Sequence, residues 1–312
     1  MIKIGIIGLG NMGSTHLRVL SILKNVQISF IYDKNSKLMK ILAKKYNYNS
    51  TNDLKNDLNK IDALIISSPT NTHYKYLKMA IGKVKNIFVE KPLTNYLDQS
   101  KDIFGLVKKF KTNFQIGMIE RFNPVFGTVK NIIKNEKKPI VCKFNRSSNL
   151  SDRIKDTDVI YDLMIHDIDL ALNFNGPVKK IVSIGKKFNN MIKYVHSEIY
   201  HKNGTISIIE VSRITNKKIR SISFLFKKAF CEVNLLNKEI SISKNPVMTN
   251  NKNRGFLFNT QEQKIEVKPQ EAALSQMNSF IKSCLKREKI DNKYYLDSLQ
   301  ICNYINKSIK LF

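Results

Sequence analysis

An aspartate, a histidine and a lysine have the types and spacing for proton chemistry. Asp162 and His166 are four residues apart, which places both side chains on one face of a predicted helix. An imidazole accepts a proton near neutral pH, and a carboxylate one turn away orients the ring and stabilises the imidazolium. Lys91 lies between Glu90 and Pro92 and offers a fixed cation. The set fits acid–base catalysis, whereas Asp162 and His166 alone fit a capped helix start equally well.

The first residues of the chain predict a dinucleotide site. Residues 2–7 are an apolar run typical of a buried parallel strand, and residues 14–23 carry leucines at helical spacing. The intervening G-x-G-x-x-G pattern allows a tight turn, a close approach of a pyrophosphate and close packing of the helix. A glycine-rich surface turn is the alternative, but strand, turn and helix occur in the order that phosphate binding needs. We expect the cofactor to contact Gly8, Gly10, Asn11, Met12 and Gly13.

Asp33 indicates which dinucleotide is bound. It follows the apolar run 26–32 and lies 20 residues after Gly13, where an acidic side chain accepts hydrogen bonds from the adenosine ribose. A carboxylate there repels the 2′-phosphate of NADP, so the sequence favours NAD. Lys34 and Lys37 follow closely and would partly offset this repulsion.

The elements that position these residues alternate between strand and helix up to residue 118. We expect strands over 2–7, 26–32, 62–66, 86–89 and 113–117, and helices over 14–23, 36–46, 74–81 and 96–110. Although these ranges give only five strands, we interpret the alternation as the six-strand pattern of a doubly wound parallel sheet, a Rossmann domain over residues 1–118. Such sheets bind ligands at the carboxyl ends of their strands, although an ordinary capped loop also fits there. We assign to the cofactor site Ser68, Pro69, Asn71, His73, Glu90 and Lys91.

The remainder, residues 119–312, predicts an α+β domain with a large, mostly antiparallel open sheet. We expect strands over 140–146, 178–185, 194–200, 205–211, 219–226, 229–235 and 239–243. Residues 246–264 are polar and predict an irregular loop. Amphipathic helices are expected over 271–287 and 294–311, and the last of them fits packing back against the first domain.

Composition excludes several classes of protein. The chain of 312 residues has a net charge of +28, but the charge is mostly lysine and is spread along the sequence without arginine and aromatic clusters, which argues against nucleic-acid binding. It contains no signal-like N-terminus and no apolar run of about 18 residues, as a membrane span requires. Four scattered cysteines and isolated histidines predict reduced thiols in a cytoplasmic protein and no metal site.

The motifs together resemble the Gfo/Idh/MocA oxidoreductases over essentially the whole chain. The resemblance rests on residues 8–13, Ser67-Ser68-Pro69 with His73, Glu90-Lys91-Pro92, and Asp162 with His166. Residues 115–124, 158–162 and 212–215 further resemble a narrower group that oxidises UDP-N-acetylglucosamine to its 3-keto form.

The resemblance implies roles for individual residues. His166 would take a hydroxyl proton, Lys91 would stabilise charge on the sugar oxygen, and Asp162 would orient His166 or bind a neighbouring hydroxyl; Lys91 and His166 exchange roles in some relatives. A UDP-sugar diphosphate would bind Arg121, Arg153 and Lys155. The family also implies a homodimer or homotetramer formed through the open sheet. Two alternatives stay open, a dehydrogenase of a free sugar or polyol and a non-catalytic NAD-binding regulator.

Overall fold

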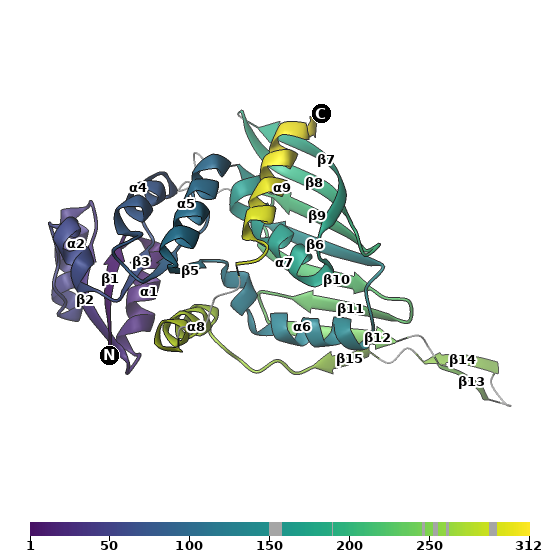
Figure 1. Cartoon of the computed structure of the whole chain (residues 1–312). Coiled ribbons are helices and arrows are strands. Elements are labelled where there is room, and N and C mark those ends of the chain that lie inside the picture. Colours follow the sequence, from purple (N-terminus) through teal and green to yellow (C-terminus); the bar gives the residue numbers. More distant parts are fainter. Residues whose placement is uncertain (150–157, 189, 245–246, 252–254, 260–261, 287–291) are drawn as a thin grey trace. The chain divides into compact units, whose positions relative to one another are not determined.

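The computed structural model describes residues 1–149, 158–188, 190–244, 247–251, 255–259, 262–286 and 292–312. The chain divides into two compact units, each built from two segments (Figure 1). Unit 1 comprises Met1–Phe122 and Glu271–Leu296, and unit 2 comprises Asn123–Gln270 and Asp297–Phe312. None of the helices in these residues is both long and apolar enough to cross a bilayer.

Unit 1 is built on a parallel sheet with the strand order β2-β1-β3-β4-β5. The strands are β1 (Ile2–Ile7), β2 (Val26–Tyr32), β3 (Ala63–Ile66), β4 (Asn86–Val89) and β5 (Asn113–Ile116). The predicted count of six strands is wrong, since residues 1–118 contain only these five apolar runs of strand length. The Rossmann class itself is confirmed, and β1, β2 and β4 have the predicted bounds.

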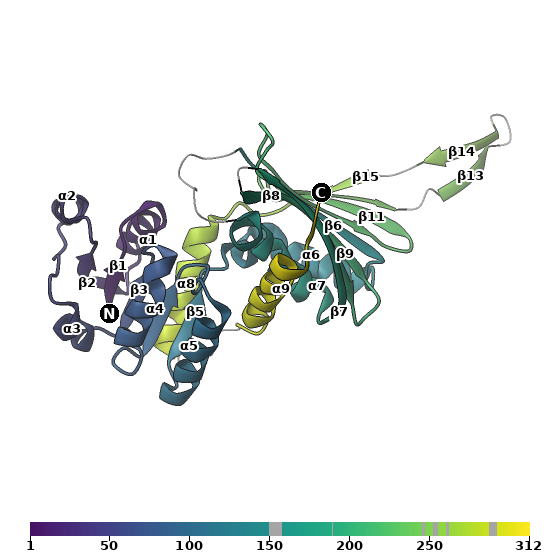
Figure 2. The same ribbon diagram turned by 90° about the horizontal axis from the view of Figure 1, so that it is seen from above.

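Helices cover the sheet of unit 1. They are α1 (Asn11–Ser21), α2 (Ser36–Tyr46), α3 (Leu54–Asp57), α4 (Thr70–Ala80), α5 (Leu97–Phe110) and α8 (Ala272–Lys286). Although α8 is distant in sequence, it lies beside α1 (Figures 1 and 2), and its Met277 and Phe280 are fully buried in one core with Ile4 and Phe88. Helix α8 therefore contributes to the core of unit 1.

Unit 2 is built on a mostly antiparallel sheet with the order β15-β12-β11-β10-β6-β9-β8-β7-β16. Its strands are β6 (Val141–Ser147), β7 (Val178–Phe188), β8 (Met191–His201), β9 (Ile206–Ser212), β10 (Ile219–Leu225), β11 (Ala229–Asn234), β12 (Glu239–Lys244), β15 (Glu262–Ile265) and β16 (Lys310–Leu311). Buried positions alternate with half-buried ones along β8 and with exposed ones along β11, as expected where only one face of a sheet is covered. The expected open-sheet architecture is confirmed.

The covered face of this sheet packs against helices (Figure 2). They are α6 (Pro124–Asn135), a π-helical turn (Ile160–Met164) that leads into α7 (Ile165–Asn175), and α9 (Tyr295–Ser308). Nearly every residue of α7 is buried, because it lies against both the sheet and its neighbouring helices. His166 is thus held in the interior of unit 2, whereas Asp162 in the preceding turn is half-buried.

Two predictions of local structure are wrong in unit 2. Residues 246–264 contain a hairpin of β13 (Val247–Asn251) and β14 (Gly255–Asn259) and the start of β15, instead of a loop. β15 is an edge strand selected by backbone pairing with β12, a signal that an apolar pattern does not carry. The predicted helix over 294–311 ends at Ser308, and Lys310–Leu311 instead pairs with β7 as β16.

Candidate active site

Two of the three glycines in the turn after β1 are required by contact. Gly8 has a φ of +91°, and a Cβ there would lie 2.2 Å from the backbone nitrogen of Ser68. A Cβ on Gly13 would lie 1.9 Å from the carbonyl oxygen of Gly8, so the helix packs on the turn at a distance that only glycine permits. At Gly10, by contrast, no described atom lies within 4 Å of that position. The turn therefore has open space where a phosphate would approach.

The start of α1 fits an anion. Gly10 is its N-cap, and within the described residues no side chain caps it, so its first-turn N–H groups remain available to a ligand. A cavity of about 510 Å³ in unit 1 is lined by residues of the turns after β1, β2 and β3. These include Gly8, Asp33, Ser68, Pro69 and Asn71, all of which the sequence assigned to the cofactor. The cavity and the helix start suit a dinucleotide.

Asp33 is fixed at the edge of this cavity by two backbone donors. Its Oδ2 accepts a hydrogen bond from the N–H of Leu9 at 2.6 Å, and its Oδ1 accepts one from the N–H of Asn35 at 2.7 Å. The carboxylate thus connects the glycine turn to the start of α2 and has a defined orientation. Each oxygen keeps a further lone pair for a ribose hydroxyl.

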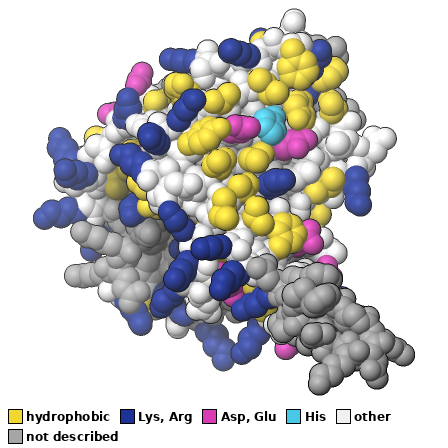
Figure 3. All heavy atoms as spheres, turned by 90° about the vertical axis from the view of Figure 1, so that its right-hand side faces the viewer, with side chains coloured by type: hydrophobic (Ala, Val, Ile, Leu, Met, Phe, Trp, Pro, Cys, Tyr) yellow, Lys and Arg dark blue, Asp and Glu magenta, His cyan; other side chains and the backbone are white. Residues whose placement is uncertain are grey.

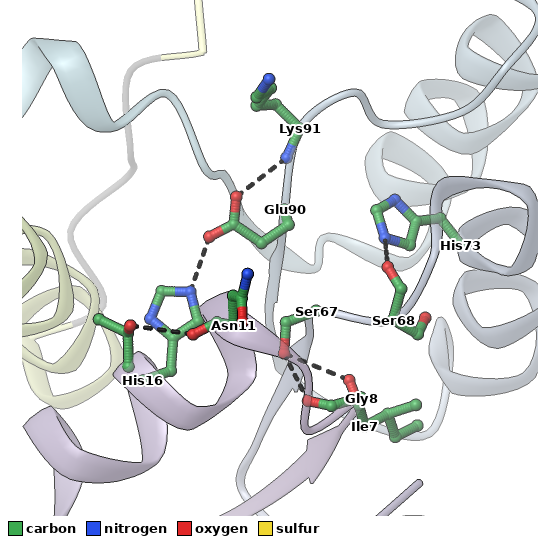
Figure 4. Close-up of polar contacts among 10 residues, drawn as sticks. Ile7, Gly8, Asn11, His16, Ser67, Ser68, His73, Glu90 and Lys91 are labelled. Carbon is green, nitrogen blue, oxygen red and sulfur yellow. Dashed lines mark hydrogen bonds and ion pairs between the residues drawn. The ribbon is translucent and has the colours of Figure 1, made fainter. Parts of the chain in front are cut away.

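The turn after β3 is bonded to the turn after β1. Ser67 Oγ donates to the carbonyl oxygen of Gly8 at 2.8 Å (Figure 4). Ser68 Oγ lies 2.7 Å from Thr72 Oγ1. His73 is 1% exposed, with Nε2 2.7 Å from the carbonyl oxygen of Ser68 and Nδ1 3.0 Å from that of Pro92. It therefore ties this turn to the turn after β4.

The electrostatics of His73 fit a structural contact. Burial lowers its pKa below the usual histidine value, while its two backbone contacts and the charge of Glu90 act more weakly in the opposite direction. A neutral ring donates one hydrogen bond only, so one of the two carbonyl contacts is a hydrogen bond and the other is a packing contact. Any contribution of His73 to cofactor binding would thus run through the two turns that it joins.

Glu90 and Lys91 extend β4 into the same region of unit 1, and the Lys91–Pro92 bond is cis. The N–H of Glu90 donates to the carbonyl oxygen of Ile66 at 2.8 Å, which continues the pairing of β4 with β3. Its Oε2 accepts from the N–H of Lys91 at 3.2 Å, and its Oε1 lies 2.7 Å from Nε2 of His16 (Figure 4). His16 was not predicted as a site residue; its position three residues after the last glycine of the turn places it on α1 but does not reveal its partner.

In unit 2, Asp162 and His166 fall on either side of a change in helix type. Asp162 lies in the π-helical turn, and His166, which is 8% exposed, is the second residue of α7. The carboxylate of Asp162 forms an ion pair with Arg213, which follows β9 and is buried. π-Helical turns are frequent at functional sites. Here the turn means that Asp162 and His166, four residues apart, are not both in the regular α-helix that the sequence predicted.

A second ion pair fixes the residue after His166. Arg146 Nε donates to Asp167 Oδ2 at 2.8 Å and Arg146 Nη2 donates to Oδ1 at 2.8 Å, with side chains only 2% and 3% exposed. The bidentate geometry attaches the start of α7 to β6 of the sheet. Two arginines of the sheet region therefore hold the carboxylates on both sides of His166.

The predicted substrate cations are only partly described. Arg121 lies in a short 3₁₀ turn, Ile119–Phe122, that ends the first segment of unit 1. Arg153 and Lys155 lie outside the described residues. No cluster of three or more potential metal ligands occurs within the residues that the structure describes.

The structure thus brings together the cofactor residues of unit 1 and, separately, the residues around His166 in unit 2. Lys91 belongs to unit 1 and His166 to unit 2. Their action on one substrate atom remains a prediction.

Comparison with known proteins identifies the first unit. The profile of the Gfo/Idh/MocA oxidoreductases, described as an NAD-binding Rossmann fold, matches residues 2–118. The UDP-N-acetylglucosamine 3-dehydrogenase of Acidithiobacillus ferrooxidans is 24% identical over 243 residues, 77% of this chain and 76% of that protein. The NAD-dependent scyllo-inositol 2-dehydrogenase of Bacillus subtilis is 36% identical over 137 residues, 42% of this chain and 40% of that protein.

The fold match extends over nearly the whole chain. A solved structure of the Acidithiobacillus enzyme superposes with a TM-score of 0.88 at 20% identity, covering 99% of this chain and 97% of that one. The glycine turn, the cavity beside it and the family profile agree on a nicotinamide dinucleotide as the cofactor. Residues 2–118 are therefore the NAD-binding Rossmann domain of a Gfo/Idh/MocA family oxidoreductase.

Proposed function

We propose that the protein is an NAD-dependent dehydrogenase that oxidises C3 of UDP-N-acetylglucosamine to the 3-keto sugar. The observation that carries the proposal is the attachment of Lys91 to the dinucleotide site. Through Glu90 and His16 the lysine backbone is tied to α1, the helix whose start forms the glycine turn. A cation held there suits a reaction beside the nicotinamide.

The residues of the chain divide the chemistry between them. The bound nicotinamide supplies the hydride acceptor. His166 takes the proton of the sugar hydroxyl, while the hydride leaves the carbon that bears this hydroxyl. Lys91 stabilises the negative charge that develops on the hydroxyl oxygen. Asp162, held by Arg213, keeps the turn before His166 in place or binds a neighbouring hydroxyl. Lys91 is the alternative proton acceptor.

The choice of NAD over NADP rests on Asp33. Its carboxylate is fixed by the N–H groups of Leu9 and Asn35 and cannot turn away without losing both hydrogen bonds. A 2′-phosphate placed beside it would be repelled, whereas ribose hydroxyls donate to it. Lys34 also lines the cavity and reduces this discrimination.

The substrate class rests on the relatives and on the motifs. The Acidithiobacillus relative is named for UDP-N-acetylglucosamine, and residues 115–124 and 212–215 resemble the corresponding group. A diphosphate would need cations, for which Arg121, Arg153 and Lys155 are the proposed partners. The four cysteines are free thiols, which fits the reducing cytoplasm that we propose as the location.

A substrate panel tests the proposal. The purified protein is incubated with NAD and, separately, UDP-N-acetylglucosamine, UDP-glucose, myo-inositol and scyllo-inositol, and NADH absorbance is followed. We expect reduction with UDP-N-acetylglucosamine. A preference for an inositol would favour the polyol alternative, which the match to scyllo-inositol 2-dehydrogenase supports. Binding of NAD without turnover of any of these sugars would favour the non-catalytic NAD-binding regulator. The presence of Lys91, Asp162 and His166 together argues against that alternative.

A further inference from the structure

A fully buried histidine in α1 connects the glycine turn to the turn that carries Lys91. His16 is 0% exposed, and its Nε2 lies 2.7 Å from Oε1 of Glu90. The other carboxylate oxygen of Glu90 accepts the backbone N–H of Lys91 at 3.2 Å. Figure 4 shows the three residues in one line, with Glu90 between the imidazole and the lysine backbone.

Both members of the buried pair have little room to move. The ring of His16 packs edge-to-face against Phe88, with centroids 5.1 Å apart, and Phe88 packs against Phe280 of α8 at 5.7 Å. Glu90 lies against Gly117, where a Cβ would come within 2.6 Å of Oε2. The imidazole of His16 is therefore held by packing against aromatic rings, and the carboxylate of Glu90 is held by its close approach to the backbone of Gly117.

The second ring nitrogen of His16 indicates the tautomer. Nδ1 is buried and has no hydrogen-bond partner within the described residues. A proton on Nδ1 would leave a buried donor unsatisfied, which is costly, so the proton belongs on Nε2. His16 then donates to Glu90, and the carboxylate receives one N–H on each oxygen.

We propose that His16 is a positioning residue for Lys91. The hydrogen bond from His16 fixes Glu90, and Glu90 fixes the backbone of Lys91 relative to the start of α1. The ammonium group of Lys91 is thereby positioned beside the dinucleotide site. His16 itself contacts neither substrate nor cofactor in this role. The proposal rests on the function proposed above for Lys91.

Two substitutions at His16 separate the hydrogen bond from the packing. His16→Phe keeps a ring against Phe88 but removes the donor to Glu90, whereas His16→Gln keeps an amide N–H that reaches the same carboxylate. We expect His16→Phe to lower kcat by about 10- to 100-fold, the effect of a small misplacement in an active site. NADH affinity, measured by fluorescence, should change little, and His16→Gln should recover most of kcat.

Hydrogen exchange gives a readout that needs no turnover. Between Glu90 and Leu93 only a few backbone amides exchange. Pro92 has no N–H, so the amides that follow Glu90 are those of Lys91 and Leu93. The Lys91 amide should exchange about tenfold faster or more in His16→Phe than in the wild type or in His16→Gln, since its acceptor has lost its anchor. If His16→Phe does not fold, the double variant His16→Phe/Glu90→Gln, which also removes the buried carboxylate, carries the same expectations.

A matched control is His201→Phe in unit 2. His201 is also buried, and its nitrogens contact the carbonyl oxygen of Gly176 and Ser207 Oγ, both of which belong to unit 2, whereas Glu90 and Lys91 belong to unit 1. Equal loss of kcat in His201→Phe and His16→Phe, or an unchanged Lys91 amide in His16→Phe, would overturn the proposal. A wild type that turns over no sugar would instead overturn the proposed function, and the exchange comparison would still decide whether His16 holds Lys91.

Discussion

At the residue scale, the role of Lys91 predicts a loss confined to the chemical step. Lys91→Ala should lower kcat/KM by about 10²- to 10⁴-fold, because it removes the charge that stabilises the developing alkoxide or the group that takes its proton. NADH binding should persist, since the glycine turn is untouched. The matched control is Lys101→Ala, which removes an exposed lysine near Asp98 on α5 and should leave steady-state kinetics unchanged. Wild-type kinetics in Lys91→Ala would contradict the assignment.

Asp33 predicts a change of cofactor preference. Replacing the carboxylate in Asp33→Asn removes a like-charge repulsion with the 2′-phosphate of NADP, and about 1.4 kcal/mol of such repulsion corresponds to roughly a factor of ten. The ratio of kcat/KM for NADP to that for NAD should therefore rise by about tenfold or more. The measurement is NADPH and NADH formation at matched sugar concentration. A ratio that stays constant would show that Asp33 does not select the cofactor.

Single residues also show what the sequence could reveal about the site. Gly8, Gly13 and Asp33 were predictable because a fixed turn geometry demands those residue types at those spacings. His16 was not, because a histidine in an apolar helical pattern does not reveal that its partner is Glu90, 74 residues away in sequence. Likewise, the spacing of Asp162 and His166 does not reveal Arg213 as the partner of Asp162.

At the element scale, the pair of Arg146 and Asp167 attaches α7 to the sheet of unit 2. Arg146→Met leaves the carboxylate of Asp167 buried without its countercharge and should lower the free energy of unfolding by about 3–5 kcal/mol. The double variant Arg146→Met/Asp167→Leu should regain much of this loss, because the uncompensated charge is gone. Urea unfolding measures both.

A surface pair provides the control for this prediction. Lys78→Met removes an exposed ion pair with Asp102 and should leave stability nearly unchanged. If Arg146→Met were as harmless as Lys78→Met, the buried pair would not be what holds the start of α7.

Buried histidines predict how stability depends on pH. Burial lowers the pKa of His73 and of His201, so both are neutral in the folded chain and gain a proton on unfolding below their usual value of 6.5. The unfolded state therefore binds more protons, and stability falls on acidification through pH 6.5, by at most about 1.4 kcal/mol per pH unit for each histidine. Thermal melting of wild type and His201→Phe between neutral and mildly acidic pH checks this, and the variant should show the shallower dependence. Equal dependence would exclude His201 as a contributor.

The elements differ in how well the sequence predicts them. β1, β2, β4 and α2 were predicted with their observed bounds, because short apolar runs and helical periodicity are local properties. The edge strand β15 was missed because its formation depends on an open neighbour, β12, that the local sequence does not contain. The π-helical turn before α7 was missed for a similar reason, since its backbone register depends on tertiary contacts.

At the scale of the whole molecule, the open face of the unit 2 sheet predicts self-association. Val182 and Ile184 of β7 and the paired Leu225 and Phe230 are 39–46% exposed although they are large and apolar. Figure 3 shows such apolar side chains gathered on this side of the molecule, with Lys and Arg mostly around them. A cavity of about 780 Å³ lies on the β6–β12 side of the sheet. We propose that a second copy of the chain covers this face.

The assembly prediction is tested by sedimentation. Wild type should be a dimer or tetramer, and Ile184→Glu should shift it towards the monomer by burying a charge in the interface. Ile41→Glu, at a more exposed apolar position on α2 of unit 1, should not change the assembly. A wild type that is monomeric at all concentrations would contradict this.

The unit to which each C-terminal helix belongs could not be predicted from its local sequence. The periodicity of residues 271–287 shows that one face of a helix is buried, but it does not say against which partner. In the structure α8, which the sequence analysis included in residues 119–312, belongs to the core of unit 1, whereas α9 has most of its residues in unit 2.

The account depends most on one transfer, the hydride from C3 of the sugar to the nicotinamide. The direct measurement is a single turnover with NAD and UDP-N-acetylglucosamine that carries deuterium at C3, followed by mass spectrometry of both products. We predict NADH one mass unit heavier, a 3-keto sugar without the label, and transfer that is slower by about 10²-fold or more in Lys91→Ala. Unlabelled NADH, or a sugar that keeps its deuterium while NAD is reduced, would contradict the account.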